Sequence, residues 1–187
     1  MRRFVTFFLV LFAMSFTTVS AQLPKAPAEM KGKIVTGGNF GLDFYGRSFY
    51  LGVSPQVGYR LTPGLEAGVR LGYSLHYYFD SYYGNYSVHH LSAGVYVNYE
   101  VIKGLYIHLE DEESCRLVYE GLASNGSDPR YYNSLFVGAG YREYFSEKAY
   151  AYISLLYNMR WNYSANGEVN SPYSRPLIVR VGYCVGL

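Results

Sequence analysis

Charged residues recur at alternate positions of several apolar segments, and they are the groups best suited to acid–base or ion-pair chemistry. In the segment 65–78, Glu66 and Arg70 alternate with apolar residues such as Leu65 and Val69. Side chains of an extended chain point to opposite faces in turn, so the charges of a segment share one face. The predicted set is Asp43, Arg60, Glu66, Arg70, Glu100, Glu110, Glu112, Arg116, Arg142, Arg160 and Arg180.

A confined interior best explains a charged face that carries both signs. Buried charges are tolerated when they are paired and hydrogen-bonded, and breaking such a pair costs several kcal/mol. We therefore expect the arginines and carboxylates to interlock as a salt-bridge plug. A proton path or a catalytic carboxylate pair is the alternative, and its candidates are Glu100, Glu110 and Glu112.

The pair His90 and Ser92, separated by one residue, is a second candidate for chemistry. It resembles the His-x-Ser pair of outer-membrane lipid A deacylases, small barrels in which a histidine activates a serine for ester cleavage. Those enzymes keep the pair on the lipid-facing surface, whereas the alternation here turns His90 and Ser92 toward the charged face. The pair is kept for the enzyme alternative, and the main expectation is that no residue is catalytic.

Histidine and cysteine spacing predicts neither a metal site nor a cofactor. His76, His89 and His108 lack the spacing of a metal site on one strand and an obvious acidic partner. Cys115 and Cys184 are the only cysteines. The strands expected to carry them are neither adjacent nor at the same height, so we expect two free thiols.

The chain begins with the features of a secretory signal peptide. Two arginines precede an apolar run, and Val19, Ser20 and Ala21 supply small residues before a cleavage site. We expect residues 1–21 to be removed, residues 22–32 to form a periplasmic tether and residues 33–187 to form the folded domain. Losing Arg2 and Arg3 lowers the 16 basic residues to 14, equal to the 14 acidic ones. A neutral mature chain argues against a nucleic-acid partner.

The mature chain reads as a succession of alternating segments separated by turns, which predicts an all-β fold. Pro55 cannot donate a ladder hydrogen bond, so we expect a kink or bulge there. In the fifth segment Asp111 and Glu113 fall on the apolar face, which leaves open a bulge or a position at the membrane rim. The predicted strands are 33–44, 48–61, 65–78, 88–101, a fifth from residue 105, 131–145, 150–161 and 177–187.

The lengths of the connections predict how these strands are arranged. The connections after the second, fourth and sixth segments are short, and those after the third, fifth and seventh are long. Short periplasmic turns and longer outer loops are typical of an outer-membrane barrel whose chain ends lie on the periplasmic side. The sequence therefore predicts an eight-stranded antiparallel up-and-down transmembrane β-barrel.

Aromatic residues gather at the expected outer ends of the strands. Amphipathic rings anchor in the headgroup layer of a membrane, so a girdle is the main interpretation. Tyrosine-rich loops can also bind an extracellular ligand. The residues are Tyr77, Tyr78, Tyr82, Tyr83, Tyr86, Tyr131, Tyr132, Trp161 and Tyr163.

The last residues of the chain resemble those of a known group of proteins. Its pattern is Arg180-x-Gly182-x-x-Val185-x-Leu187. With the leader and eight alternating segments, it looks like the small Gram-negative outer-membrane barrels of OmpA transmembrane-domain or OmpX type. The resemblance implies that the barrel insertion machinery reads this ending. The usual final residue is aromatic, and here it is leucine. The stretches 54–60 and 170–177 are similar to a largely uncharacterised set of such proteins.

These features predict a monomer in the outer membrane with a plugged, salt-bridged lumen and a structural, adhesive or surface-interaction role. Outer-membrane lipids and lipopolysaccharide are the expected surroundings. Two alternatives remain. One is a lipid A modifying enzyme, and the other is an exported lipocalin-like barrel. A lipocalin would place apolar residues inside and polar ones outside, so the side of the wall that the arginines occupy separates it from a membrane barrel.

Overall fold

The computed structural model describes residues 34–79, 84–120, 129–146, 148–162, 170–173 and 175–187. The predicted signal peptide and tether lie outside these residues. Eight strands make up the folded part. They are β1 (Ile34–Tyr45), β2 (Ser48–Arg60), β3 (Leu65–Tyr78), β4 (Tyr86–Ile102), β5 (Leu105–Glu120), β6 (Arg130–Tyr144), β7 (Ala149–Asn158) and β8 (Leu177–Gly186).

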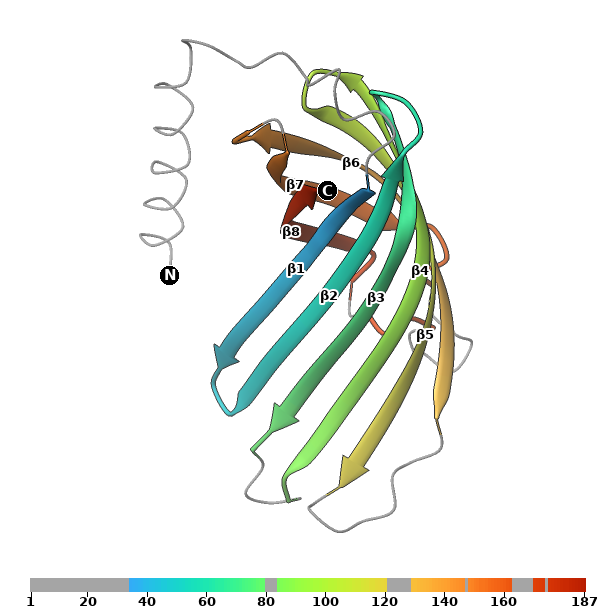
Figure 1. Cartoon of the computed structure of the whole chain (residues 1–187). Helices are drawn as coiled ribbons and strands as arrows, with labels where there is room; N and C mark the ends of the chain where they lie inside the picture. Colours follow the sequence, from blue (N-terminus) through green and yellow to red (C-terminus); the bar gives the residue numbers. More distant parts are fainter. Residues whose placement is uncertain (1–33, 80–83, 121–128, 147, 163–169, 174) are drawn as a thin grey trace, which may run out of the picture.

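The strands form a closed antiparallel barrel in which each strand pairs with the next and β8 returns to β1 (Figure 1). The predicted fold class and strand order are therefore confirmed. Strand lengths differ around the wall. β4 has 17 residues and β5 has 16, whereas β7 and β8 have 10 each. The wall is therefore taller on the side of β4 and β5.

The two faces of the wall have opposite chemistry. Along β7, Tyr150 and Tyr152 point inward and are 1% and 5% exposed, whereas Ile153 and Leu155 point outward and are 39% and 51% exposed. The inward face of other strands buries full charges, among them Arg60 at 1% and Glu110 at 0%. The apolar residues of this barrel therefore face its surroundings and the ions face its centre.

β5 carries its acidic residues without a bulge. Against β4 its register shifts once, between Glu100 and Ile102 of β4, and is unbroken from Tyr106 to Glu120; against β6 it is unbroken from Leu105 to Arg116. Asp111 and Glu113 consequently stay on the outer face, where the Asn133 amide donates to both. Asp111 pairs with Leu135, whose carbonyl accepts a hydrogen bond from Met159, the residue after the end of β7. The two acids therefore lie level with the rim of the shorter wall.

The backbone departs from a regular ladder at the position expected from proline. The β2–β3 pairing lapses at Ser54 and Pro55 and resumes in the same register. Pro55 pairs on its other side with Gly38, whose φ of 146° is one that side chains with a Cβ rarely adopt. The β2–β3 ladder is therefore interrupted at Pro55 without a change of register.

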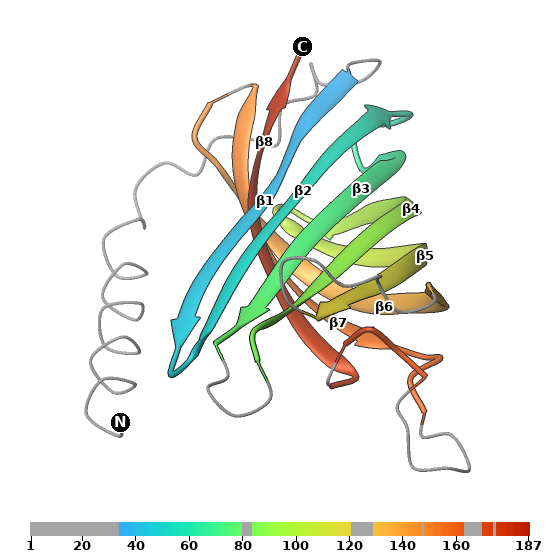
Figure 2. The ribbon, with the colours of Figure 1, turned by 90° about the horizontal axis from the view of Figure 1, so that it is seen from below.

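Beyond Gly38 the seam between β1 and β8 opens. Four residue pairs join β1 to β8, from Val35 with Gly186 to Gly38 with Tyr183. Beyond them the two strands diverge in both views (Figures 1 and 2). Continuing the same register would place Leu42 opposite Val179, and both side chains point outward.

We expect this seam to close in a lipid bilayer, because unpaired backbone groups are costly in hydrocarbon. Leu42→Cys and Val179→Cys, introduced together with Cys115→Ser and Cys184→Ser, should form a disulfide on oxidation in vesicles. Non-reducing electrophoresis after proteolysis would detect it. Leu42→Cys with Val181→Cys, offset by two residues, is the control. Equal cross-linking of both pairs, or of neither, would contradict the continued register.

Candidate functional site

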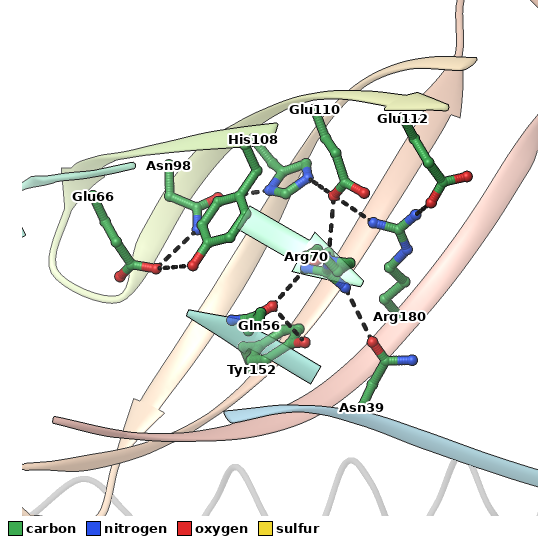
Figure 3. Close-up of polar contacts among 12 residues, drawn as sticks. Asn39, Gln56, Glu66, Arg70, Asn98, His108, Glu110, Glu112, Tyr152 and Arg180 are labelled. Carbon is green, nitrogen blue, oxygen red and sulfur yellow. Dashed lines mark hydrogen bonds and ion pairs between the residues drawn. The ribbon is translucent and has the colours of Figure 1, made fainter. Parts of the chain in front are cut away.

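Two buried carboxylates, Glu110 of β5 and Glu66 of β3, each contact several side chains in the lumen. Glu110 of β5 accepts contacts from three side chains on its Oε2 atom (Figure 3). Arg180 Nη1 of β8 lies at 2.6 Å, His108 Nε2 at 2.9 Å and Arg70 Nε of β3 at 3.4 Å. Strands that are distant in the sequence are therefore held together around one oxygen.

The second carboxylate is Glu66 at the start of β3. Its Oε2 atom lies 3.1 Å from Arg142 Nη2 and 3.6 Å from Arg60 Nε. The hydroxyls of Tyr96 and Tyr150 donate to Glu66 at 3.1 and 3.2 Å. Every one of these five side chains is buried. Glu66 thus joins β2, β4, β6 and β7 at the end of the barrel where β1 begins and β8 ends.

A polar chain connects the two carboxylates. Asn98 Nδ2 donates to Glu66 at 3.4 Å, and Asn98 Oδ1 lies 2.6 Å from His108 Nδ1. His108 then contacts Glu110 with its other ring nitrogen. Each nitrogen of this ring therefore faces an oxygen, and the two centres form one network (Figure 3).

Two further carboxylates complete the charge balance. Glu112 lies 3.5 Å from Arg180 Nη2 and accepts from the Tyr173 hydroxyl at 2.7 Å. Glu100 lies 4.0 Å from Arg142 Nη1 and accepts from the Tyr144 hydroxyl at 2.8 Å. The ion pairs of the network thus involve four arginines and four glutamates, which cancel. Neutrality is what makes so many buried ions tolerable.

Glycines on the inner face leave space for aromatic rings that cover the ions. A Cβ on Gly140 would collide with the Tyr106 ring, and one on Gly182 would collide with Tyr152. The guanidinium of Arg142 lies 4.5 Å from the centre of the Tyr106 ring, within the range of a cation–π contact. The rings therefore contribute both volume and attraction to the plug.

A small cavity lies inside the network. Its lining includes Arg70, His108, Arg142 and Ser154, and its volume is about 10 Å³. That is room for about one water molecule. The interior at this level is filled by side chains, as expected for eight strands.

The structure brings together eight of the eleven residues predicted for the lumen. They are Arg60, Glu66, Arg70, Glu100, Glu110, Glu112, Arg142 and Arg180. Arg116 lies on the inner-facing register of β5 opposite His90, above this network. The side chain of Asp43 lies outside the described residues.

The placement of Arg160 in the lumen was wrong. β7 ends at Asn158, so the alternation of this strand does not extend to Arg160. Its guanidinium pairs with Asp111 at 2.9 Å, and both side chains are about half exposed, at 47% and 49%. Arg160 instead contacts the polar group on the outer face of β5 and β6.

Several members of the network were missed by the sequence argument. His108 and Asn98 occupy the same faces as the predicted charges, so the alternation itself could have identified them. Gln56 on β2, which accepts from Arg70 at 2.7 Å, follows the same rule. Tyr173 lies in the connection between β7 and β8, where no periodicity indicates a direction.

His90 and Ser92 both lie on the inner-facing register of β4. The His90 ring packs edge-on against Tyr173, with ring centres 6.0 Å apart. Ser92 pairs with Gly72 of β3. In the described part of the chain no hydrogen bond joins the two residues, and they face away from the apolar surface.

The residues of the C-terminal pattern contact other strands of the barrel. Arg180 belongs to the ion network and Gly182 lies under Tyr152. The Leu187 amide donates to the Ile34 carbonyl at 2.8 Å, at the base of the seam. Cys115 and Cys184 are both free thiols, as predicted.

The described residues contain no group of three or more histidine, cysteine or acidic side chains placed to hold a metal ion. They also contain no helix that is long and apolar enough to cross a membrane.

The chain is similar in fold to other barrels of known structure. The N-terminal β-barrel domain of Pseudomonas aeruginosa OprF matches with a TM-score of 0.42 and 15% identity, covering 84% of this chain and 98% of that one. A de novo designed transmembrane β-barrel matches with a TM-score of 0.43 and 16% identity, covering 84% of this chain and 97% of the designed one. Neisserial surface protein A matches with a TM-score of 0.42 and 13% identity, covering 82% of this chain and 92% of that one. No protein-family profile and no curated protein sequence matches the chain.

Removal of the Glu110 charge should destabilise the barrel, because it leaves Arg180 and Arg70 buried without their shared partner. We expect Glu110→Gln to lower the free energy of unfolding by about 3–5 kcal/mol. Urea titration in lipid vesicles would measure it. Glu113→Gln, on the exposed outer face of the same strand, should change it by less than about 1 kcal/mol. Similar losses in both variants would show that the network does not depend on Glu110.

Proposed function

We propose that this protein spans the outer membrane of a Gram-negative cell. The observation that supports this most directly is the inversion of its two faces, with ions inside and apolar side chains outside. Leu71, Val95 and Val179 on three different strands are about 60% exposed, at 59%, 61% and 61%. On β4 the outward residues are apolar from Leu91 to Val101, a stretch that suits the roughly 9–11 residues of a tilted transmembrane strand.

The orientation follows from the two ends of the barrel. β1 begins and β8 ends at the same end as the tight connections 61–64 and 103–104. In outer-membrane barrels that end faces the periplasm. The taller strands β4 and β5 then extend beyond β7 on the outer side. Lipopolysaccharide and other outer-membrane lipids are the proposed surroundings, and the insertion machinery is the proposed assembly partner.

A structural or adhesive role of a monomer suits this architecture better than transport. The ion network and its aromatic cover fill the lumen, which leaves no described path for a solute. The outer ends of the strands instead present aromatic side chains, including Tyr77, Tyr78, Tyr86 and Tyr131, for contact with headgroups or an extracellular ligand. Tyr82, Tyr83 and Tyr163 of the predicted girdle lie outside the described residues. The ion-filled interior also argues against a lipocalin-like ligand cavity.

Expression of the full chain in a Gram-negative host tests the location. The protein should sediment with the outer membrane, and mass spectrometry should show that residues 1–21 have been removed. Its mobility in electrophoresis should change on boiling, as expected for a folded barrel. Recovery as a soluble periplasmic protein without detergent would contradict the proposal.

The plugged lumen predicts almost no conductance in a planar bilayer. Folded protein should give a current indistinguishable from that of protein-free detergent, because no continuous aqueous path crosses the network. The folded fraction of the same sample should be confirmed by its shift in mobility on boiling. Large, stable single-channel steps would refute the plug.

A further inference from the structure

A row of polar side chains crosses the inner face of four neighbouring strands, beyond the ion network. Tyr50 of β2 pairs with His76 of β3, and His90 of β4 pairs with Arg116 of β5. Between β3 and β4, His90 pairs with Ser74, two residues from His76, so the two histidines are diagonal neighbours. Tyr50, His76, His90 and Arg116 thus form a continuous upper row near the end of the barrel where β1 ends and β4 begins.

The upper row is more exposed than the network beneath it. Its four side chains lie on the inner-facing register, yet each stays partly exposed. In the network, by contrast, Glu110 and Arg70 are 0% and 4% exposed. In the membrane placement proposed above, the upper row lies toward the outer side. A molecule outside the cell can therefore reach it without passing the plug.

Arg116 brings an uncompensated charge to this row. The four arginines and four glutamates of the network cancel, and Arg116 is not among them. No carboxylate in the part of the chain that the structure describes lies within ion-pair distance of Arg116. The side chains of Asp43 and Glu120, near the same end of the inner-facing register, lie outside the described residues. The described groups of the upper row therefore favour an anion.

Two further features add to this preference. On β6 the residue directly opposite Arg116 is Arg130, a second guanidinium on the inner-facing register. Like charges placed opposite each other repel, and an anion between them relieves the repulsion. On β4 the Nε2 atom of His90 is buried without a hydrogen-bond partner among the described residues. Because buried polar atoms usually have a partner, acceptors are scarce at this level of the lumen.

Aromatic rings extend the upper row toward the rim. The ring centres of Tyr50 and His76 lie 4.5 Å apart, and His76 stacks with Tyr78 at 6.3 Å. Tyr78 in turn stacks with Tyr86 at 4.5 Å. Ligand sites typically combine aromatic side chains with a few charged or polar groups that orient the ligand. A sugar, whose ring has an apolar C–H face and polar edges, matches this combination.

We propose that the upper row binds an oxyanion carried by a sugar, such as the phosphate or carboxylate group of an acidic saccharide outside the cell. Arg116 donates paired N–H bonds to the oxyanion, a geometry that guanidinium groups favour. The rings of Tyr50, His76 and Tyr78 lie beside the sugar. The inference rests on the proposed membrane location and gives the proposed adhesive role a class of ligand.

Calorimetric titration of the protein, purified from outer membranes and transferred to phosphatidylcholine nanodiscs, tests the site. Glucose 6-phosphate and galacturonate should bind, and neutral glucose should not. Inorganic phosphate should bind more weakly than glucose 6-phosphate, because it lacks a ring to contact the aromatic side chains. Equal affinity for these two phosphates would overturn the sugar as part of the ligand. Absence of binding by both acidic sugars would overturn the whole proposal.

Substitutions assign the binding to the upper row. Arg116→Gln should weaken glucose 6-phosphate binding by about 10-fold or more, because it removes charged hydrogen bonds. Arg160→Gln, which removes an exposed arginine from the outer face, is the matched control and should bind like the wild type. Tyr78→Ala should weaken the binding of glucose 6-phosphate and leave that of inorganic phosphate unchanged. Equal affinities of Arg116→Gln and Arg160→Gln would contradict the assignment.

The folded state of each sample separates this inference from the location on which it rests. Arg116→Gln breaks no described ion pair, so its mobility should shift on boiling as in the wild type. Arg116→Lys, which keeps the charge without the paired geometry, should bind with intermediate affinity. Unchanged affinity in Arg116→Lys would overturn the paired contact. A heat-modifiable barrel that binds no acidic sugar would overturn the site alone, whereas a soluble protein would overturn the membrane location.

The same titration identifies the source of the sugar. Nanodiscs that contain lipopolysaccharide place the acidic sugars of this lipid beside the barrel. Loss of glucose 6-phosphate binding in these nanodiscs would support the site and identify lipopolysaccharide as its ligand. Binding that persists there would support the site with a free saccharide as its ligand.

Discussion

A carboxylate inside a narrow barrel can keep its charge when cations from other strands contact it. Glu110 depends on such contacts from two distant strands. Arg180 comes from the last strand, Arg70 from the third and His108 from the same strand as Glu110. The two arginines connect their strands to the same oxygen of Glu110. Because isolated ions in such an interior are costly, the network favours one arrangement of strands over partly assembled ones.

Volume limits the network as strictly as charge does. Eight strands enclose space for a column of side chains and little more. The arginines and tyrosines fit because glycines such as Gly140 and Gly182 remove side-chain volume at the points of closest approach. Charge balance and small residues therefore act together, and both follow from the size of the barrel.

The outer surface is less uniform than the interior. Most of it is apolar, but Asp111, Glu113, Asn133 and Arg160 make a polar group level with the short rim above β7. Ser87, His89 and Tyr73 make another, just beyond the apolar run of β4. Asp111 and Glu113 pair with Val95 and Ala93 of β4, so the two polar groups lie at different positions along adjacent strands.

The alternation of polar and apolar residues was enough to predict much of this fold. It predicted eight strands, the direction of their faces and most of the charges that meet in the lumen, because period two depends on local backbone geometry. It could not reveal that β7 stops at Asn158 and leaves Arg160 outside, or that Tyr173 reaches Glu112 from a connection. Nor could it choose between a bulge and the rim for Asp111. The partners of Glu110, the opening of the seam and the meeting of His89 with Tyr73 depend on strand register and barrel closure. Those are set by contacts between residues far apart in the chain, and only the tertiary structure decides them.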